Sequence, residues 1–260
     1  MVFRVLKHMC YNYSLLMTWR KGINGDYSTL DDLLEIDLSE IEKFKDSFQD
    51  HFYVNSYTLP KMPVITNEQS GKIQMYTWGL IPYWTKNQEE ADKIRTKTMN
   101  ARAETLFDKP SFRHAIRKKR CLIPASGFYE WRYLLGRNYP YYIYLKDRPI
   151  FYFAGIWESW HPPDSDDTVY TYSIITCEPN NLLRKIHNKK KRMPVILPLE
   201  TQKGWIDNSL SEDEIKKFMV AYPDDEMDAY TISKRITSKT QDRNVKKVIE
   251  PFNYPEIEGM

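Results

Sequence analysis

Four runs of apolar and aromatic residues, each of strand length, follow one another through the middle of the chain. They are Cys121–Arg132, Tyr139–Lys146, Ile150–Trp157 and Val169–Thr176, and Gly, Pro and Asp residues separate them. Shorter runs at 12–18, 52–58 and 72–80 add further strands. The predicted helices are interspersed without strict strand–helix alternation, which disfavours a parallel sheet. We therefore expect an α+β fold: one domain built on a strongly curved, mostly antiparallel β-sheet or barrel, with short helices on its flanks.

Local signals place these helices. Ser39 and Glu42 form a capping box that opens an acidic helix over 39–50, and Ser211 with Glu214 forms another. Pro179 is suited to the first position of a helix that carries Leu182, Leu183 and Ile186.

Composition limits the class of protein. The chain has 260 residues, of which 42% are hydrophobic and 28% charged, so it has enough apolar residues for a core. Its 3 cysteines are too few for a secreted disulfide framework. The longest apolar run is of strand length, and no signal peptide is evident. We predict a cytoplasmic, monomeric protein without a membrane anchor.

Charge is distributed unevenly along the chain. The net charge is only +3, yet residues 25–50 are acidic, whereas 93–120 and 184–192 are basic. Aromatic residues reach 14%. Basic and aromatic side chains together can bind exposed nucleobases and phosphates, although charge alone equally fits a solvated surface.

Cys10 follows Met9 and has two interpretations. A free cysteine is usually a small buried packing residue. If the mature chain instead begins at Cys10, the residue carries an α-amine beside its thiol, and the two groups together can trap an aldehyde as a five-membered thiazolidine. That chemistry needs no metal and no cofactor, but it requires residues 1–9 to be absent or removed.

Four further segments are rich in unusual residues. They are Trp78–Trp84 (WGLIPYW), Met99–Thr105 (MNARAET), Cys121–Trp131 (CLIPASGFYEW), and His187 with Arg192–Leu197 (RMPVIL). Together with Met9-Cys10, and in this order, they resemble the signature of the SOS-response-associated peptidase (SRAP) family, the abasic-site processing proteins. The resemblance spans residues 10–240, with 1–9 as a leader or an incorrectly assigned start and 241–260 as a C-terminal tail.

The resemblance implies a protein that recognises an abasic deoxyribose in single-stranded DNA and forms a crosslink with its ring-opened aldehyde. By this resemblance Cys10 is the nucleophile and Asn100 orients the reacting amine. Glu130 moves protons during Schiff-base formation and ring closure. His187 assists opening of the sugar and stabilises the developing oxyanion.

The resemblance also implies DNA contacts outside the reacting centre. Arg102 and Arg192 would hold phosphates that flank the lesion. Trp78, partly in the core, and Trp131 would form an apolar wall against neighbouring bases.

Each of these residues also has an ordinary structural interpretation. Glu130 could point to solvent, but β alternation puts it on the face of Phe128; if that face is the core, the carboxylate is buried. His187 at a helix C-terminus is favoured by the helix dipole alone. Asn100 and Arg102 could form a turn and a surface salt bridge. Two further residues, Cys121 and Cys177, are predicted to be packing residues.

The sequence departs from the family pattern at two points. Tyr11-Asn12 stand where the family usually has Gly-Arg. The family commonly places Arg two residues after the histidine, whereas Asn188–Lys191 separate His187 from Arg192. Either the loop bulges and returns Arg192 to its place, or a lysine substitutes for it.

Three functions therefore stay open at the level of sequence. The first is covalent capture of abasic sites. The second is a thiol hydrolase in which Cys10, His187 and Asn100 act together and which could remove its own leader. The third is a non-covalent single-stranded DNA binder.

Overall fold

The structure is a computed structural model that describes residues 11–16 and 48–258. Cys10 lies outside these residues. Of the helix expected over 39–50, only 48–50 are described, and these three residues are not helical.

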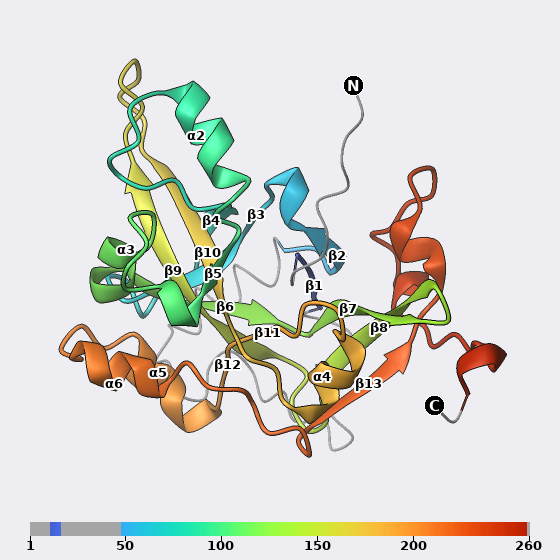
Figure 1. The fold of residues 1–260 in the computed structure, drawn as a ribbon. Helices are drawn as coiled ribbons and strands as arrows, with labels where there is room; N and C mark the ends of the chain where they lie inside the picture. The colour runs from blue at the N-terminus through green and yellow to red at the C-terminus, as the bar shows by residue number, and fades with distance from the viewer. Residues whose placement is uncertain (1–10, 17–47, 259–260) are drawn as a thin grey trace.

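Five strands close into a ring that forms the barrel expected from the sequence (Figure 1). In order around the ring they are β10 (Val169–Cys177), β4 (Gln74–Trp78), β3 (Lys61–Thr66), β6 (Arg120–Ala125) and β9 (Phe151–Trp160). Every neighbouring pair is antiparallel except β10 and β4, which are parallel. The predicted α+β class, with a curved and mostly antiparallel sheet, is confirmed.

The barrel interior is closely packed around Gly155 of β9. A Cβ atom at this position would lie 2.4 Å from Cδ1 of Ile123 and 2.8 Å from Sγ of Cys121. Only glycine allows these side chains to approach the strand so closely. Burial raises the pKa of the Cys121 thiol well above its ordinary value. Cys177, also buried, has its pKa raised to about 12 by burial. Both cysteines are packing residues, as predicted.

A second, five-stranded antiparallel sheet lies beside the barrel. Its order is β13 (Met227–Thr231), β8 (Arg137–Leu145), β7 (Gly127–Leu134), β1 (Asn12–Leu15) and β2 (His51–Asn55). The predicted run over 121–132 is thus divided between two sheets. The division falls at Ser126, whose N–H donates to the Ser14 carbonyl and whose Oγ accepts from the Leu16 N–H.

At one end of the barrel β9 and β10 diverge, and other strands occupy the opening. Their direct pairing ends at Ile174 and Gly155. Beyond this point β11 (Met193–Pro194) pairs with β10, and β12 (Ile196–Leu197) pairs with β9. On its other edge β10 pairs first with β4 and then with β5 (Asn100–Arg102). This arrangement brings the segments that carry Asn100 and Arg192 to the same end of β10.

The helices are short and lie on the outside of the sheets. They are α2 (Gln88–Arg95), α3 (Arg113–Lys118), α4 (Asn181–Ile186), α5 (Gln202–Trp205) and α6 (Glu212–Lys217). The 3₁₀ turns are η1 (Ser56–Thr58), η2 (Ala103–Thr105), η3 (Leu199–Thr201), η4 (Lys234–Thr237), η5 (Lys246–Val248) and η6 (Pro255–Ile257).

The starts of α6 and α4 can be compared with the sequence predictions. The capping box of Ser211 and Glu214 is present at the start of α6 and confirms that prediction. Placing Pro179 inside α4 was wrong. The helix begins at Asn181, because the Asn180 side chain accepts the Leu183 N–H and so forms the N-cap, which leaves Pro179 outside.

Residues 241–258, expected as a tail, pack onto the second sheet at the right of Figure 1. Val248, Ile249 and Tyr254 are buried there, and the Phe252 N–H donates to the carbonyl of Thr231. Among the described residues, no helix has the length and apolar character needed to cross a membrane.

Candidate active site

Glu130 lies inside the molecule, midway along β7. Its exposed fraction is 0%, and its neighbour Phe128 on the same face belongs to the main core. Tyr129 faces the other way, into a separate cluster. The face predicted from β alternation is therefore confirmed, and the solvent-facing alternative is excluded. A buried carboxylate is costly unless other groups compensate for its desolvation, which marks this position as a candidate functional site.

His187 is buried beside Glu130, and the end of α4 holds it there. Its N–H donates to the Leu183 carbonyl, which makes it the C-terminal cap of the helix, as predicted. The Nδ1 atom lies 2.9 Å from the Arg192 carbonyl oxygen and 3.6 Å from Oε1 of Glu130. A helix end and a strand that are far apart in sequence thus bring an imidazole and a carboxylate together.

The contact with Arg192 determines which ring nitrogen carries the proton. A carbonyl oxygen only accepts, so Nδ1 of His187 must donate, and in the neutral ring Nε2 is then the acceptor. Nε2 is buried and has no hydrogen-bond partner among residues 11–16 and 48–258. An imidazole in this state can take a proton from a group placed at Nε2.

The start of β1 lies next to this pair. In the antiparallel pairing of β1 with β7, Tyr13 is opposite Phe128 and Ser14 is opposite Gly127. Continuing the same register brings Tyr11 level with Glu130. Cys10 precedes Tyr11 in the sequence but lies outside the described residues, so its predicted role is not tested by the geometry.

A narrow gap with no room for a water molecule lies where strands converge near the site. It is lined by Asn12, Tyr13, Trp78, Phe128, Phe153, Ile174 and Pro194. These residues come from β1, β4, β7, β9, β10 and β11. The strand that carries Glu130, the start of the described chain and Ile174, the partner of Asn100 on β10, therefore meet at one packed junction.

Asn100 and Arg102 lie on β5, which pairs with β10. Asn100 is buried opposite Ile174, whereas Arg102 is exposed opposite Thr176. Both are on a strand rather than in the turn that the ordinary interpretation required.

Trp78 does not form an exposed wall. Its exposed fraction is 0%, its Nε1–H donates to the Met99 carbonyl at 2.8 Å, and its ring lies beside those of Tyr13 and Tyr172. The expectation that Trp78 stands partly against bases needs correction, because closure of the barrel by β4 and β10 encloses the ring completely. Trp131, by contrast, is half-buried at the edge of the second cluster.

Arg192 is also turned inward. It is 6% exposed, and its two terminal nitrogens contact the two carboxylate oxygens of Glu104 at 2.5 and 3.0 Å. Nη2 also donates to Oγ1 and to the carbonyl oxygen of Thr176. Burial alone would raise the pKa of Glu104, but the hydrogen bonds and charge of Arg192 outweigh it and lower that pKa. The guanidinium is occupied by these partners, so its expected role as an open phosphate ligand needs correction.

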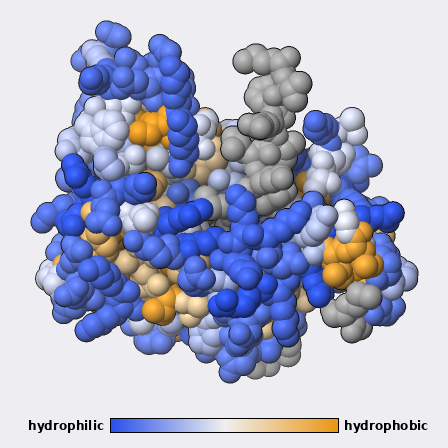
Figure 2. Space-filling view, viewed as in Figure 1, coloured by the Kyte–Doolittle hydropathy of each residue, from blue (hydrophilic) through white to orange (hydrophobic). Residues whose placement is uncertain are grey.

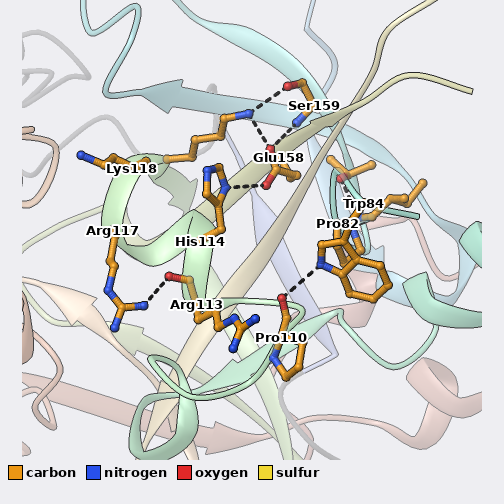
Figure 3. Close-up of polar contacts among 12 residues, drawn as sticks. Pro82, Trp84, Pro110, Arg113, His114, Arg117, Lys118, Glu158 and Ser159 are labelled. Atoms are coloured by element: carbon orange, nitrogen blue, oxygen red, sulfur yellow. Dashed lines mark hydrogen bonds and ion pairs between the residues drawn. The ribbon is translucent and has the colours of Figure 1, made fainter. Parts of the chain in front are cut away.

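The sequence reasoning missed an exposed aromatic pair. Tyr83 and Trp84 are 55% and 43% exposed, in the loop after β4. Trp84 donates from Nε1 to the Pro110 carbonyl, and the Tyr83 ring contacts that of His114 on α3. Figure 3 shows Trp84 near this basic helix, with His114 directed at the buried Glu158. Both residues lie in the segment Trp78–Trp84, whose second tryptophan is the exposed one.

No group of three or more His, Cys, Asp or Glu side chains within the described ranges is arranged to bind a metal ion. Figure 2 shows that one face of the molecule is largely hydrophilic, with a few separate hydrophobic patches.

Residues 9–239 match the family model described as SOS response associated peptidase (SRAP). The chain belongs to this family. It is 38% identical over 215 residues to the abasic site processing protein YoqW of Bacillus subtilis, a match that covers 82% of this chain and 92% of that protein. It is 33% identical over 149 residues to the abasic site processing protein HMCES of Xenopus tropicalis, covering 50% of this chain and 43% of the relative.

A solved structure supports the fold. The crystal structure of a protein from Bacteroides thetaiotaomicron superposes with a TM-score of 0.76 at 40% identity, covering 82% of this chain and 90% of that one. The SRAP resemblance inferred from the five motifs is therefore confirmed.

Proposed function

We propose that this protein recognises abasic sites in single-stranded DNA and captures them covalently through Cys10, once that residue is N-terminal. The observation that carries the proposal is the buried pair of Glu130 and His187, with Nε2 of the imidazole open as an acceptor. The relatives named abasic site processing proteins support the choice of substrate. The family match, which begins at residue 9, supports a domain that starts close to Cys10.

The proposed reaction combines one amine, one thiol and one aldehyde. The Cys10 amine adds to C1 of the ring-opened deoxyribose, and loss of one water gives an imine. The thiolate then attacks the same carbon, the nitrogen takes up a proton, and a thiazolidine ring closes. The net reaction releases one water and needs no oxidant or cofactor.

Glu130 and His187 would move the protons in this sequence. Glu130 lies opposite Tyr11 when the register of β1 and β7 is continued, and it would pass a proton to the departing hydroxyl during imine formation. His187 would take a proton at Nε2 from the sugar hydroxyl as the ring opens. Asn100, buried on β5, would orient the amine.

DNA would be held by groups on the surface of the protein. Arg102 would bind a flanking phosphate, and Trp131 with the exposed Tyr83 and Trp84 would stack against bases. We further propose that residues 1–9 are removed from the mature protein, which acts as a monomer in the cytoplasm.

The test compares three versions of the protein on an abasic single-stranded oligonucleotide, read on a denaturing gel. The version that begins at Cys10 is expected to form a stable adduct, because its amine is free. A version with one glycine before Cys10 is expected to form none, because a peptide nitrogen cannot make the imine. The full-length chain is expected to react only if intact-mass measurement shows residues 1–9 removed.

Two cysteine variants separate the alternatives. Cys10→Ser keeps the amine and is expected to give at most a reversible imine that borohydride traps. Cys10→Ala is expected to keep salt-sensitive binding without a stable adduct. A stable adduct from the glycine-blocked version would contradict the proposal and favour a thiol mechanism, and no adduct from any version would leave only non-covalent binding.

A further inference from the structure

The turn that follows His187 is strongly cationic. Residues 188–191 (Asn-Lys-Lys-Lys), here called the lysine turn, join α4 to β11, and all three lysines are exposed. The whole segment 184–192 contains no Asp or Glu. Within the described residues, no carboxylate forms an ion pair with Lys190 or Lys191.

The turn is held firmly against the edge of β7. The Asn188 side chain accepts from the Tyr133 N–H at 3.0 Å and donates to the Tyr133 carbonyl at 2.7 Å. Nζ of Lys189 lies 3.2 Å from the centre of the Tyr133 ring, which is a cation–π contact. Lys191 has a φ of 50° and donates its N–H to the His187 carbonyl, so it closes the turn. These contacts fix a local concentration of positive charge beside His187.

The guanidinium of the adjacent Arg192 is already occupied by hydrogen bonds to Glu104 and Thr176. The turn is therefore an exposed cationic segment that directly follows His187 in the chain. The area of Figure 2 over α4 and β11 is hydrophilic, as a surface that meets a charged strand should be.

We propose that the lysine turn is a phosphate clamp for the DNA strand that flanks the reacting sugar. Lys190 and Lys191 bind backbone phosphates, while Lys189 stays against Tyr133 and keeps the turn in place. This inference rests on the proposed function and assigns one of its binding surfaces. Lysine ammonium groups suit such contacts because they are point charges that read the backbone and not the base sequence.

The test measures the affinity of the Cys10-starting protein for an undamaged single-stranded oligonucleotide at several salt concentrations. The double variant Lys190→Gln/Lys191→Gln is expected to bind about five- to tenfold more weakly. The slope of log K against log salt should fall in magnitude by about 1.4, because each lost phosphate contact accounts for about 0.7 on a single strand. The matched control Lys239→Gln/Lys247→Gln removes the same charge from exposed positions in the C-terminal part and is expected to change neither quantity.

Three results are informative. Equal losses in both double variants would mean a general charge effect and would overturn the clamp. An unchanged affinity in the turn variant, with normal crosslinking of abasic DNA, would also overturn the clamp while leaving the proposed function intact. A loss confined to the turn variant in a protein that forms no adduct would support the clamp and contradict the covalent chemistry.

A second pair of variants tests positioning by Tyr133. Tyr133→Leu removes the ring under Lys189 and is expected to weaken binding about twofold to threefold without changing the salt slope, because no charge is lost. Tyr133→Phe keeps the ring and is expected to bind like the wild type. A salt slope that falls in Tyr133→Leu would contradict a purely positional role.

Discussion

At position 130 a carboxylate lies fully inside the molecule, within 3.6 Å of an imidazole nitrogen. Desolvating a carboxylate opposes folding, so its presence in a packed strand indicates a role beyond stability. The hydrogen bond from Nδ1 of His187 to the Arg192 carbonyl leaves Nε2 as the acceptor nitrogen of the neutral ring.

Glu130→Gln tests this role at the scale of one residue. The amide has the same shape but cannot shuttle a proton, so we expect the single-turnover rate of adduct formation to fall at least about a hundredfold. The affinity for single-stranded DNA should change little. Equal losses of rate and affinity, or a lowered unfolding midpoint of matching size, would assign Glu130 a structural role instead.

At the scale of elements, the ion pair of Glu104 and Arg192 joins η2 to the residue that precedes β11. The arginine is nearly buried, and the Glu104 carboxylate compensates its positive charge. Glu178 lies farther from the same guanidinium, with its carboxylate oxygen 3.7 Å from Nη1, and is more exposed.

This pair predicts a pH-dependent difference in stability. The pKa of Glu104 is lowered in the folded protein, so its contribution is present above the ordinary value of 4.5 and is lost as the pH falls through the lowered folded value. Glu104→Gln is expected to lower the free energy of unfolding by about 1–2 kcal/mol at neutral pH. The gap from the wild type should shrink in acid, as measured by urea denaturation at several pH values.

The control for this prediction is Glu178→Gln, which removes the same charge at a longer distance from Arg192. Its effect at neutral pH should be clearly smaller than that of Glu104→Gln. A gap between wild type and Glu104→Gln that widens in acid would contradict the argument.

At the scale of the whole molecule, the C-terminal segment is part of the fold. Its buried residues complete two smaller clusters on the outer face of the five-stranded sheet. Tyr254 fastens the segment by donating from its hydroxyl to the Ile232 carbonyl at 2.9 Å.

Two apolar residues of this segment provide a matched comparison. Ile249 is completely buried, whereas Phe252 is 46% exposed. Ile249→Ala is expected to cost about 2–5 kcal/mol of unfolding free energy, and Phe252→Ala clearly less, because only the first leaves a cavity. Similar small losses in both variants, measured by urea denaturation, would show that the segment contributes little to the fold.

The sequence by itself determined the local features. Alternation placed Glu130 on the face of Phe128, Ser211 and Glu214 predicted the start of α6, and the order of the motifs predicted the family. These signals are legible because a strand repeats every two residues and a cap acts within one turn.

Only the tertiary structure decided the rest. Closure of β10 on β4 buried Trp78, and pairing of β11 with β10 turned Arg192 toward Glu104. The same packing set the ring of His187 against the Arg192 carbonyl and left the lysine turn exposed. The partners in these contacts come from separate segments of the chain. No local pattern states which face a closed barrel will cover, because burial there depends on strands that meet only after folding.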